Sequence, residues 1–432
     1  MNAFDAARDG TDAQASVGLL DKRYANFGAA SVLFFQRPIE MVRAEGCWME
    51  AVDGTRYLDF YNNVPSVGHS HPHVVQAVQR QIGILNTNTR YLNATVEAYL
   101  ERLKAKLPGG PWNVLMSCTG SEANDLALRI AMAATGAEGI IVTETAYHGN
   151  TLLTTQASPS SYKRGKPPRN IATVPAPGPE AYGDDIAGNF AAAVTRAITR
   201  LKRRGYRPAA LLCDSIFSSD GVFADPPGFL ADAVATARAA GALFIADEVQ
   251  PGFARTGDAF WGFGRHGVDP DFVTTGKPMG NGFPMAATAV HPDLLERFCR
   301  TFGYFNTFGG NPVAAAAGDA VLDVIENEDL QANADSVGAH LTGRLRKLAD
   351  RDARIGAVRG AGLFIGLDLC SGANPDPDLA TIVINALRER HVMVGACGKY
   401  GHTLKIRPPL CLSRAEADIF ADALADTLSA LG

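Results

Sequence analysis

The feature that most constrains the fold lies in residues 241–284, where two short apolar runs each lead into an ionisable side chain. Residues 242–246 precede Asp247, and residues 271–275 precede a Gly-Lys-Pro turn that contains Lys277. Short apolar runs bounded by turn residues are typical of buried strands in a parallel sheet. Because open α/β sheets bind ligands at the carboxyl ends of their strands, we expect Asp247 and Lys277 at one ligand site.

An acid and a lysine in this arrangement are the two groups that a pyridoxal 5′-phosphate (PLP) enzyme requires. The lysine forms a Schiff base with the cofactor, and the acid pairs with the pyridinium nitrogen, so that the ring accepts electrons. A lone Asp at a strand end usually caps a helix, and a lone Lys is usually a solvated surface residue. The pairing of Asp247 with Lys277 favours the catalytic interpretation.

Composition limits the classes of protein to which the chain can belong. Its 432 residues suggest two domains, and 47% hydrophobic with 20% charged residues is typical of a soluble globular protein. A net charge of −5 gives no basic footprint for nucleic acid. No apolar run approaches the ~20 residues of a membrane helix, and the polar N-terminus lacks the apolar core of a secretory signal. Seven cysteines without a C-x-x-C pair indicate neither a disulfide framework nor a zinc site, so we expect a cytoplasmic enzyme.

The stretches DEVQPGFARTG and TTGKPMGNGFP resemble the signature of class III aminotransferases, which are fold-type-I PLP enzymes. The resemblance extends from about residue 31 to residue 428. It implies an α/β fold with a mostly parallel central sheet flanked by helices and a smaller α+β domain formed by the chain ends. The implied division is an N-terminal arm with small-domain strands in residues 1–70, a large PLP-binding domain in 71–320, and a C-terminal small domain in 321–432.

The segment WNVLMSCTGSEANDLALR predicts a strand at 114–116, a turn at Gly120 and Ser121, and a helix from Glu122 onward. Free N–H groups and the helix dipole make such a helix start an anion site. The resemblance assigns Gly120 and Ser121 to the cofactor phosphate. The residues alone leave open that Ser121 is only a helix N-cap.

The resemblance implies further cofactor contacts. Tyr147 is expected to stack on the pyridine ring beside His148, and Gln250 is expected near the phenolic oxygen. Thr307, in the T-x-G-G-N-P pattern, is expected to reach the cofactor phosphate of a neighbouring subunit. The active site would then be shared across a homodimer, and a tetramer remains open.

Three other patterns do not indicate ligand sites. His69, His71 and His73 have no accompanying Cys or carboxylate, so we predict no metal there. Gly360 and Gly362 precede a strand-like run, whereas a dinucleotide fingerprint follows a strand and opens a helix. Gly276-Lys277 is no phosphate-binding P-loop, because Pro278 stands where Ser or Thr would bind magnesium.

One departure from the family pattern concerns the substrate. Many members have an arginine three residues before a Pro-Pro pair, where it binds a substrate carboxylate; here that residue is Lys405, and Arg407 adjoins Pro408. Lys is a point charge that suits a tetrahedral phosphate. In the family, the acidic residue that shields this arginine usually stands in an E-P-x-Q sequence. Here the corresponding residue is Asp214 in CDSIFSSDG, which is a second departure. Stretches such as YLDFYNNVPSVGHSHP, GKPMGNG and LKIRPPLC resemble the branch of phospho-lyases acting on ethanolamine phosphate and phosphohydroxylysine.

We therefore expect a PLP-dependent phospho-lyase that converts O-phosphoethanolamine or a related phosphorylated amine to an aldehyde, ammonia and phosphate. Lys277 and Asp247 would carry the catalysis, and Lys405, Arg407 and Arg23 would hold the substrate phosphate. Two alternatives stay open: an ω-amino-acid or amine:pyruvate aminotransferase, which shares every cofactor residue, and a PLP-binding scaffold without catalysis.

Overall fold

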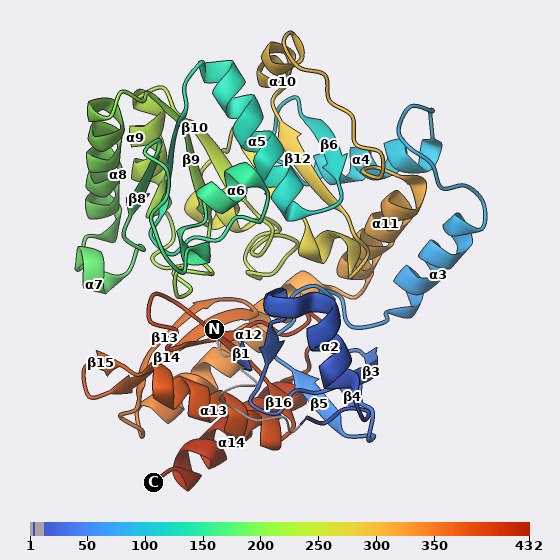
Figure 1. The fold of residues 1–432 in the computed structure, drawn as a ribbon, viewed down its shortest axis with the longest axis vertical. Helices are drawn as coiled ribbons and strands as arrows, with labels where there is room; N and C mark the ends of the chain where they lie inside the picture. The colour runs from blue at the N-terminus through green and yellow to red at the C-terminus, as the bar shows by residue number, and fades with distance from the viewer. Residues whose placement is uncertain (1–2, 5–12) are drawn as a thin grey trace.

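The computed structural model describes residues 3–4 and 13–432, which form two lobes, one above the other in Figure 1. The large lobe is built on a seven-stranded sheet in the order β6-β12-β11-β10-β9-β7-β8. The strands are β6 (Asn113–Ser117), β7 (Gly139–Thr143), β8 (Ile171–Val174), β9 (Pro208–Asp214), β10 (Leu243–Asp247), β11 (Phe272–Thr275) and β12 (Ala286–Val290). Within this described sheet β12 runs in the opposite direction to the other six strands, so the predicted mostly parallel sheet is confirmed.

Helices cover both faces of this sheet because its central strands are apolar on both sides. In β9, Ala210 and Leu212 pack into one cluster with α5 (Gly120–Thr135), whereas Leu211 and Cys213 pack into another with α8 (Ile186–Arg203). The other helical segments of this lobe are α3 (Pro72–Ile82), α4 (Ala94–Ala105), α6 (Leu152–Gln156), α7 (Pro179–Tyr182), α9 (Leu230–Ala239), α10 (Pro292–Cys299), α11 (Pro312–Asn327), and the 3-10 turns η2 (Pro159–Ser161), η3 (Gly262–His266) and η4 (Lys277–Gly280).

The small lobe is assembled from both ends of the chain, as the α+β prediction required. The antiparallel strands β3 (Met41–Glu45), β4 (Trp48–Ala51) and β5 (Arg56–Asp59) are joined by β16 (Val392–Met393), which pairs in parallel with β5. A second sheet has the order β13-β14-β18-β17, from β13 (Ile355–Ala361), β14 (Phe364–Ser371), β17 (Gly395–Cys397) and β18 (Thr403–Ile406), and β15 (Asn374–Pro375) pairs with β14. We propose that residues 70 and 320 mark the domain boundaries.

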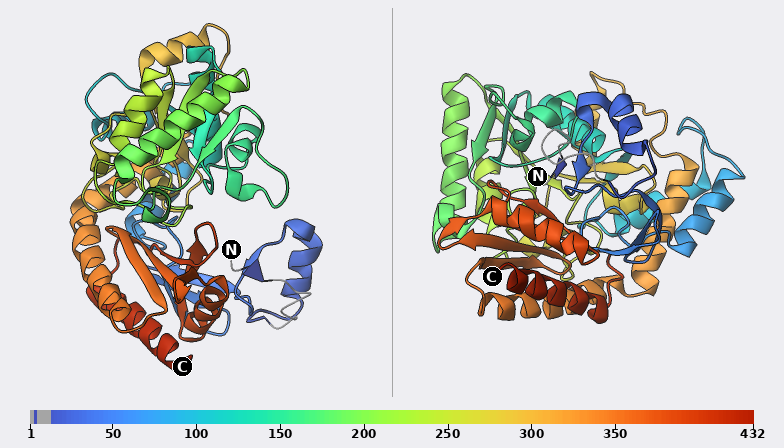
Figure 2. Two further views of the ribbon diagram at one scale, coloured as in Figure 1. Left: turned by 90° about the vertical axis from the view of Figure 1, so that its left-hand side faces the viewer. Right: turned by 60° about the horizontal axis from the view of Figure 1, so that its bottom comes forward.

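The remaining elements of the small lobe are helices and a short N-terminal strand pair. They are α2 (Leu19–Phe27), the 3-10 turn η1 (Gly28–Ala30), α12 (Leu330–Ala349), α13 (Pro377–Glu389), α14 (Arg414–Ala430), and the pair β1 (Ala3–Phe4) with β2 (Leu33–Phe34). In the left view of Figure 2, α2 and its adjoining strands extend from the side of this lobe. Within the described residues we find no helix with the length and hydropathy of a membrane span.

The histidine cluster has no metal-binding geometry, because each imidazole pairs with a carboxylate of its own. His69 contacts Asp59 at 2.8 Å, and His71 contacts Glu328 at 2.9 Å. His73 contacts Asp323 at 2.8 Å. In the part of the chain that the structure describes, no group of three or more His, Cys, Asp or Glu side chains is arranged to hold a metal ion.

Candidate active site

The structure brings Asp247 and Lys277 to one cavity at the carboxyl ends of β10 and β11. These strands are neighbours in parallel register, with Asp247 opposite Thr274, so their ends meet at the same edge of the sheet. The cavity has a volume of about 290 Å³. Its lining includes each cofactor contact predicted from the sequence apart from Thr307: Gly120, Ser121, Tyr147, His148, Asp247, Gln250 and Lys277.

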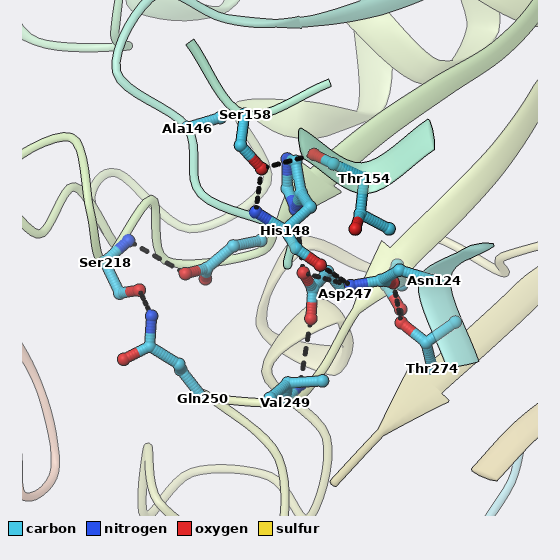
Figure 3. Close-up of polar contacts among 12 residues, drawn as sticks. Asn124, Ala146, His148, Thr154, Ser158, Ser218, Asp247, Val249, Gln250 and Thr274 are labelled. Carbon is cyan, nitrogen blue, oxygen red and sulfur yellow. Dashed lines mark hydrogen bonds and ion pairs between the residues drawn. The ribbon is translucent and has the colours of Figure 1, made fainter. Parts of the chain in front are cut away.

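Three hydrogen bonds hold the Asp247 side chain in the cavity (Figure 3). Its Oδ2 accepts hydrogen bonds from His148 Nδ1 at 2.7 Å and Asn124 Nδ2 at 2.9 Å, and its Oδ1 accepts from the Val249 amide at 3.1 Å. Asn124 is itself oriented, because its Oδ1 accepts a hydrogen bond from the Thr274 hydroxyl. Three donors satisfy the oxygens of this buried carboxylate and hold it in a single direction.

His148 is fixed from several sides. Its backbone N–H donates to the Ser158 hydroxyl at 2.8 Å, and its carbonyl accepts from Asn124 Nδ2 (Figure 3). With Nδ1 facing the Asp247 carboxylate, this nitrogen carries the proton. Nε2 is buried and has no hydrogen-bond partner among the described residues. The histidine therefore orients the acid rather than serving as a solvated base.

Lys277 follows β11 directly and opens the turn η4. Burial lowers the pKa of its amine, with a further contribution from the nearby Arg407 cation, while the Asp247 carboxylate opposes the shift. A lowered pKa increases the neutral, nucleophilic fraction of the amine near neutral pH. Lys277 also lines a second cavity of about 610 Å³, so it lies where the two spaces meet.

The start of α5 forms the predicted anion cradle, with two differences. The helix begins at Gly120 rather than Glu122, and Thr119 is the N-cap in a capping box with Glu122. The alternative of Ser121 as N-cap is therefore wrong. The capping box uses the amides of Thr119 and Glu122, which donate to the Glu122 carboxylate and the Thr119 hydroxyl. The amides of Gly120 and Ser121, at the first two helical positions, have no partner within the helix and are left for a ligand.

Glycines keep this cradle open. A Cβ atom on Gly120 would lie 2.8 Å from Val249 Cγ2, and one on Gly276 would lie 3.3 Å from the Gly120 backbone nitrogen. Gly149 has φ of +139°, and a Cβ there would lie 2.6 Å from Ser121 Oγ. A side chain at any of these positions would therefore crowd the space in front of the helix start.

The 610 Å³ cavity is strongly basic. It is lined by Lys277, Lys399, Lys405 and Arg407, and none of the described residues that line it is Asp or Glu. Lys405 lies on β18 with only 7% of its surface exposed. Burial, reinforced by the Arg407 cation, lowers the pKa of Lys405 to about 7. Such uncompensated positive charge in a buried space is costly unless an anion enters it.

Arg407 connects this basic cavity to the cofactor side. Its Nη1 donates to Gln250 Oε1 at 2.8 Å and to Asn63 Oδ1 at 3.3 Å, and its guanidinium lies 4.8 Å from the centre of the Tyr61 ring. Gln250 in turn donates to the Ser218 hydroxyl. Tyr147, with 44% of its surface exposed, lines both cavities.

Two predicted site residues lie elsewhere. Arg23 does not line either cavity; its guanidinium lies 3.6 Å from the centre of the Phe27 ring, and its Nε donates to the Ser31 hydroxyl at 3.3 Å. Thr307 is exposed on the segment that leads into α11.

Asp214 lies at the end of β9 and accepts hydrogen bonds from the amides of Ile216 and Ser218, each at 3.0 Å. Burial raises the pKa of Asp214.

Sequence reasoning missed Asn124, Thr274 and Lys399. Asn124 follows Gly120 by four residues, so helical periodicity placed it on the face that carries the anion cradle. Thr274 lies on the strand beside Asp247, where parallel register makes them neighbours. Lys399 lies in the turn between β17 and β18 and carried no signal in the sequence.

Residues 33–428 match the family model of class III aminotransferases. The chain belongs to the class III aminotransferase family. It is 36% identical over 427 residues to an alanine–glyoxylate aminotransferase 2-like protein of Drosophila melanogaster, covering 95% of this chain and 86% of that protein. It is 34% identical over 432 residues to ethanolamine-phosphate phospho-lyase homolog 1 of Caenorhabditis elegans, covering 94% of this chain and 92% of that protein.

Among solved structures, a phospholyase from Arthrobacter in complex with phosphoethanolamine is 40% identical to this class III aminotransferase-family chain. It superimposes with a TM-score of 0.92 over 96% of this chain and all of that one. The cofactor that membership indicates is PLP. The cavity fits this group, because it combines outward amides for a phosphate, a fixed carboxylate for a ring nitrogen and an amine of lowered pKa for an aldehyde.

The hydrogen bonds of Asn124 generate a prediction about cofactor retention. Replacing Asn124 by Ala removes a donor from Asp247, and hydrogen bonds to charged groups contribute about 1.5–3 kcal/mol. We expect PLP to dissociate about 10–100-fold more readily, measured as cofactor absorbance retained through dialysis. Asn170→Ala removes a side-chain amide that donates to the Glu138 carbonyl and does not line the cavity, so it is the matched control. Equal retention in both variants would contradict the role of Asn124.

Proposed function

We propose that this family member is a phospho-lyase that converts O-phosphoethanolamine, or a closely related phosphorylated amine, and water to an aldehyde, ammonia and phosphate. The observation that carries the proposal is the basic 610 Å³ cavity, whose described lining holds four Lys and Arg side chains and no carboxylate. A dianionic phosphate is the substrate group that such a cavity would stabilise most. The phosphoethanolamine bound by the Arthrobacter phospholyase supports the same substrate class.

The residues divide the chemistry between them. Bound PLP supplies an electron sink for the carbon that carries the substrate amine. Lys277 is the base that removes the proton from this carbon, because burial favours its neutral form. Asp247, held by His148 and Asn124, would pair with the ring nitrogen of bound PLP and favour its protonated form. The amides of Gly120 and Ser121 would hold the cofactor phosphate, and Tyr147 would stack on the ring.

In this proposal the leaving phosphate binds in the basic 610 Å³ cavity. Lys405 and Arg407 bind the substrate phosphate and stabilise the charge that grows on it as the carbon–oxygen bond breaks. Elimination then needs no amino acceptor, whereas transamination does. Within its own subunit Arg23 lies outside this cavity, over the Phe27 ring, so we leave it out of the proposed phosphate site.

An aminotransferase that uses pyruvate or another keto acid is the second candidate, favoured by relatives such as the Drosophila alanine–glyoxylate aminotransferase 2-like protein. One experiment separates the two. The PLP-loaded protein is incubated with O-phosphoethanolamine without keto acid, and phosphate, ammonia and acetaldehyde are measured. We expect all three in equal amounts. No release, with amine conversion once pyruvate is added, would establish the aminotransferase; no turnover of any amine would indicate a PLP-binding scaffold.

Lys405 gives the proposal a pH signature. Its folded pKa of about 7 means that the free enzyme loses the Lys405 charge as pH rises through 7. We expect kcat/KM for O-phosphoethanolamine to fall above pH 7, since kcat/KM reports ionisations of the free enzyme. Lys405→Arg keeps the charge at high pH and should remove this fall.

Two further variants test whether the Lys405 charge binds the phosphate. Lys405→Ala should lower kcat/KM about 100-fold with PLP still bound, because an anion loses its buried partner. Arg23→Ala, a loss of the same charge outside the cavity, should change it less than about twofold. If kcat/KM and its pH dependence were unchanged in Lys405→Ala, Lys405 would not belong to the phosphate site.

We also propose a homodimer in which Thr307 reaches the neighbouring subunit's cofactor phosphate. Exposed apolar side chains lie on the segment of Thr307, with Phe308 at 71% exposure, and on the segment before α4, with Leu92 at 97% and Ile84 at 72%. The two segments that carry them are held together, because the Arg90 guanidinium lies 4.2 Å from the centre of the Phe305 ring. A surface of this kind is typical of a protein interface.

Subunit mixing tests the shared site. Lys277→Ala and Thr307→Glu each inactivate the homodimer, the first by removing the amine and the second by repelling the phosphate. After dissociation and reassociation together, mixed dimers contain one site with both native residues, so activity should return. Two samples of the same variant, mixed identically, are the control. Failure to recover activity, with mixed dimers shown by differential tagging, would place Thr307 within its own subunit's site, and an active Thr307→Glu homodimer would place it outside both sites.

A further inference from the structure

Two cysteines that the proposed reaction does not use lie against each other in the small lobe. The Sγ atoms of Cys47 and Cys411 are 3.7 Å apart, and both thiols are free. Cys47 lies in the turn between β3 and β4, and Cys411 lies between β18 and α14. They are 364 residues apart in the chain, so only the folded structure brings them together.

Main-chain contacts hold both cysteines in place. The carbonyl of Cys47 accepts the Asp59 amide at 2.8 Å. Beside Cys411, the Leu410 amide donates to the Ser66 carbonyl at 2.7 Å, and Asn333 Nδ2 donates to the carbonyls of Leu410 and Leu412. The short distance between the sulfurs is therefore built into the backbone on both sides.

The two sulfurs differ in exposure. Cys47 has 2% of its surface exposed, whereas Cys411 is partly exposed. A Cβ on Gly68 would lie 2.9 Å from Cys411 Sγ, so the pair is packed tightly on that side. A small oxidant reaches Cys411 first, and Cys47 is the thiol that lies behind it.

The charges around the pair also differ between the two thiols. The hydrogen bond from the Cys47 thiol lowers the pKa of Cys411 and raises that of Cys47. The fully buried Arg255, which donates to the Ser66 hydroxyl and the Pro408 carbonyl, is the nearby cation. Glu416 is a nearby carboxylate that acts in the opposite direction on the pKa of both thiols, and Asp59 adds to this effect on Cys47 and Glu328 on Cys411. Cys411 therefore has the stronger thiolate character, which makes it the nucleophile.

We propose that Cys47 and Cys411 form an oxidative modification site that takes a small peroxide and closes to a disulfide. The Cys411 thiolate attacks one peroxide oxygen, the O–O bond breaks, and a sulfenic acid and one water form. The Cys47 sulfur then attacks the Cys411 sulfur, the S–O bond breaks, and the hydroxide leaves as a second water. The thiols lose two electrons and the peroxide gains them, and an added dithiol reverses the change.

The disulfide would tie the β3–β4 turn to a segment four residues beyond Arg407. Neither cysteine lines the two cavities, so the bond joins the two chain ends of the small lobe without entering the active site. The site is independent of whether the enzyme is a lyase or an aminotransferase.

The test uses the PLP-loaded protein treated with equimolar hydrogen peroxide, then alkylated in denaturant and digested without reductant. We expect a linked peptide pair containing Cys47 and Cys411. Free thiols should fall from the seven of the sequence toward five and return to seven with dithiothreitol. Cys47→Ser and Cys411→Ser should each abolish the linked pair, with retained cofactor absorbance as the check on folding. Cys299→Ser, which removes an exposed cysteine elsewhere, should leave it unchanged.

Other outcomes overturn the proposal. Recovery of Cys47 and Cys411 as separate alkylated peptides after the peroxide is consumed would show that they do not pair. Recovery of Cys411 as sulfinic acid beside a free Cys47 thiol would show that the second step does not occur. Linkage of either cysteine to a different partner would place the reactive pair elsewhere.

Discussion

The active site depends on the way Asp247 is held at the end of β10. A buried carboxylate is stable only with full hydrogen bonding, and here the donors come from three elements: Asn124 on α5, His148 on the loop after β7, and the amide of Val249. The contact of Asn124 with Asp247 holds the first turns of α5 against the end of β10. The same helix start presents the amides of Gly120 and Ser121, so one set of hydrogen bonds positions both the acid and the anion cradle.

Charge is distributed unequally across the two joined cavities. The cofactor cavity contains the carboxylates of Asp214 and Asp247, whereas the adjoining cavity is lined by cations without carboxylates among its described residues. Lys277 lies where they meet, and its amine is influenced by both, since Asp247 raises its pKa and Arg407 lowers it. An amine poised between an acidic and a basic region can lose and regain its proton at little cost, as a catalytic base must.

Much of the large lobe was predictable because local patterns and tertiary demands agree there. The apolar runs before Asp247 and Lys277 became β10 and β11 in parallel register. The predicted start of α5 is two residues late, because the sequence pattern favours Glu122 as the first helical residue although its side chain closes the capping box on Thr119. The position of Arg23 over the Phe27 ring, outside the cavity of its own subunit, has no local signal in the sequence.

Local sequence patterns indicated the strand ends, the approximate start of α5 and the residue types at the candidate site, because each depends on contacts between near neighbours in the chain. The sequence by itself also determined the family, through motifs that follow one another closely. The tertiary structure alone decided the contacts between distant segments: the hydrogen bond from Arg407 to Gln250, the entry of Lys399 into the basic cavity, and the meeting of Cys47 with Cys411. These follow from how β16 joins the N-terminal sheet and how the two lobes pack, and no local pattern encodes such long-range geometry.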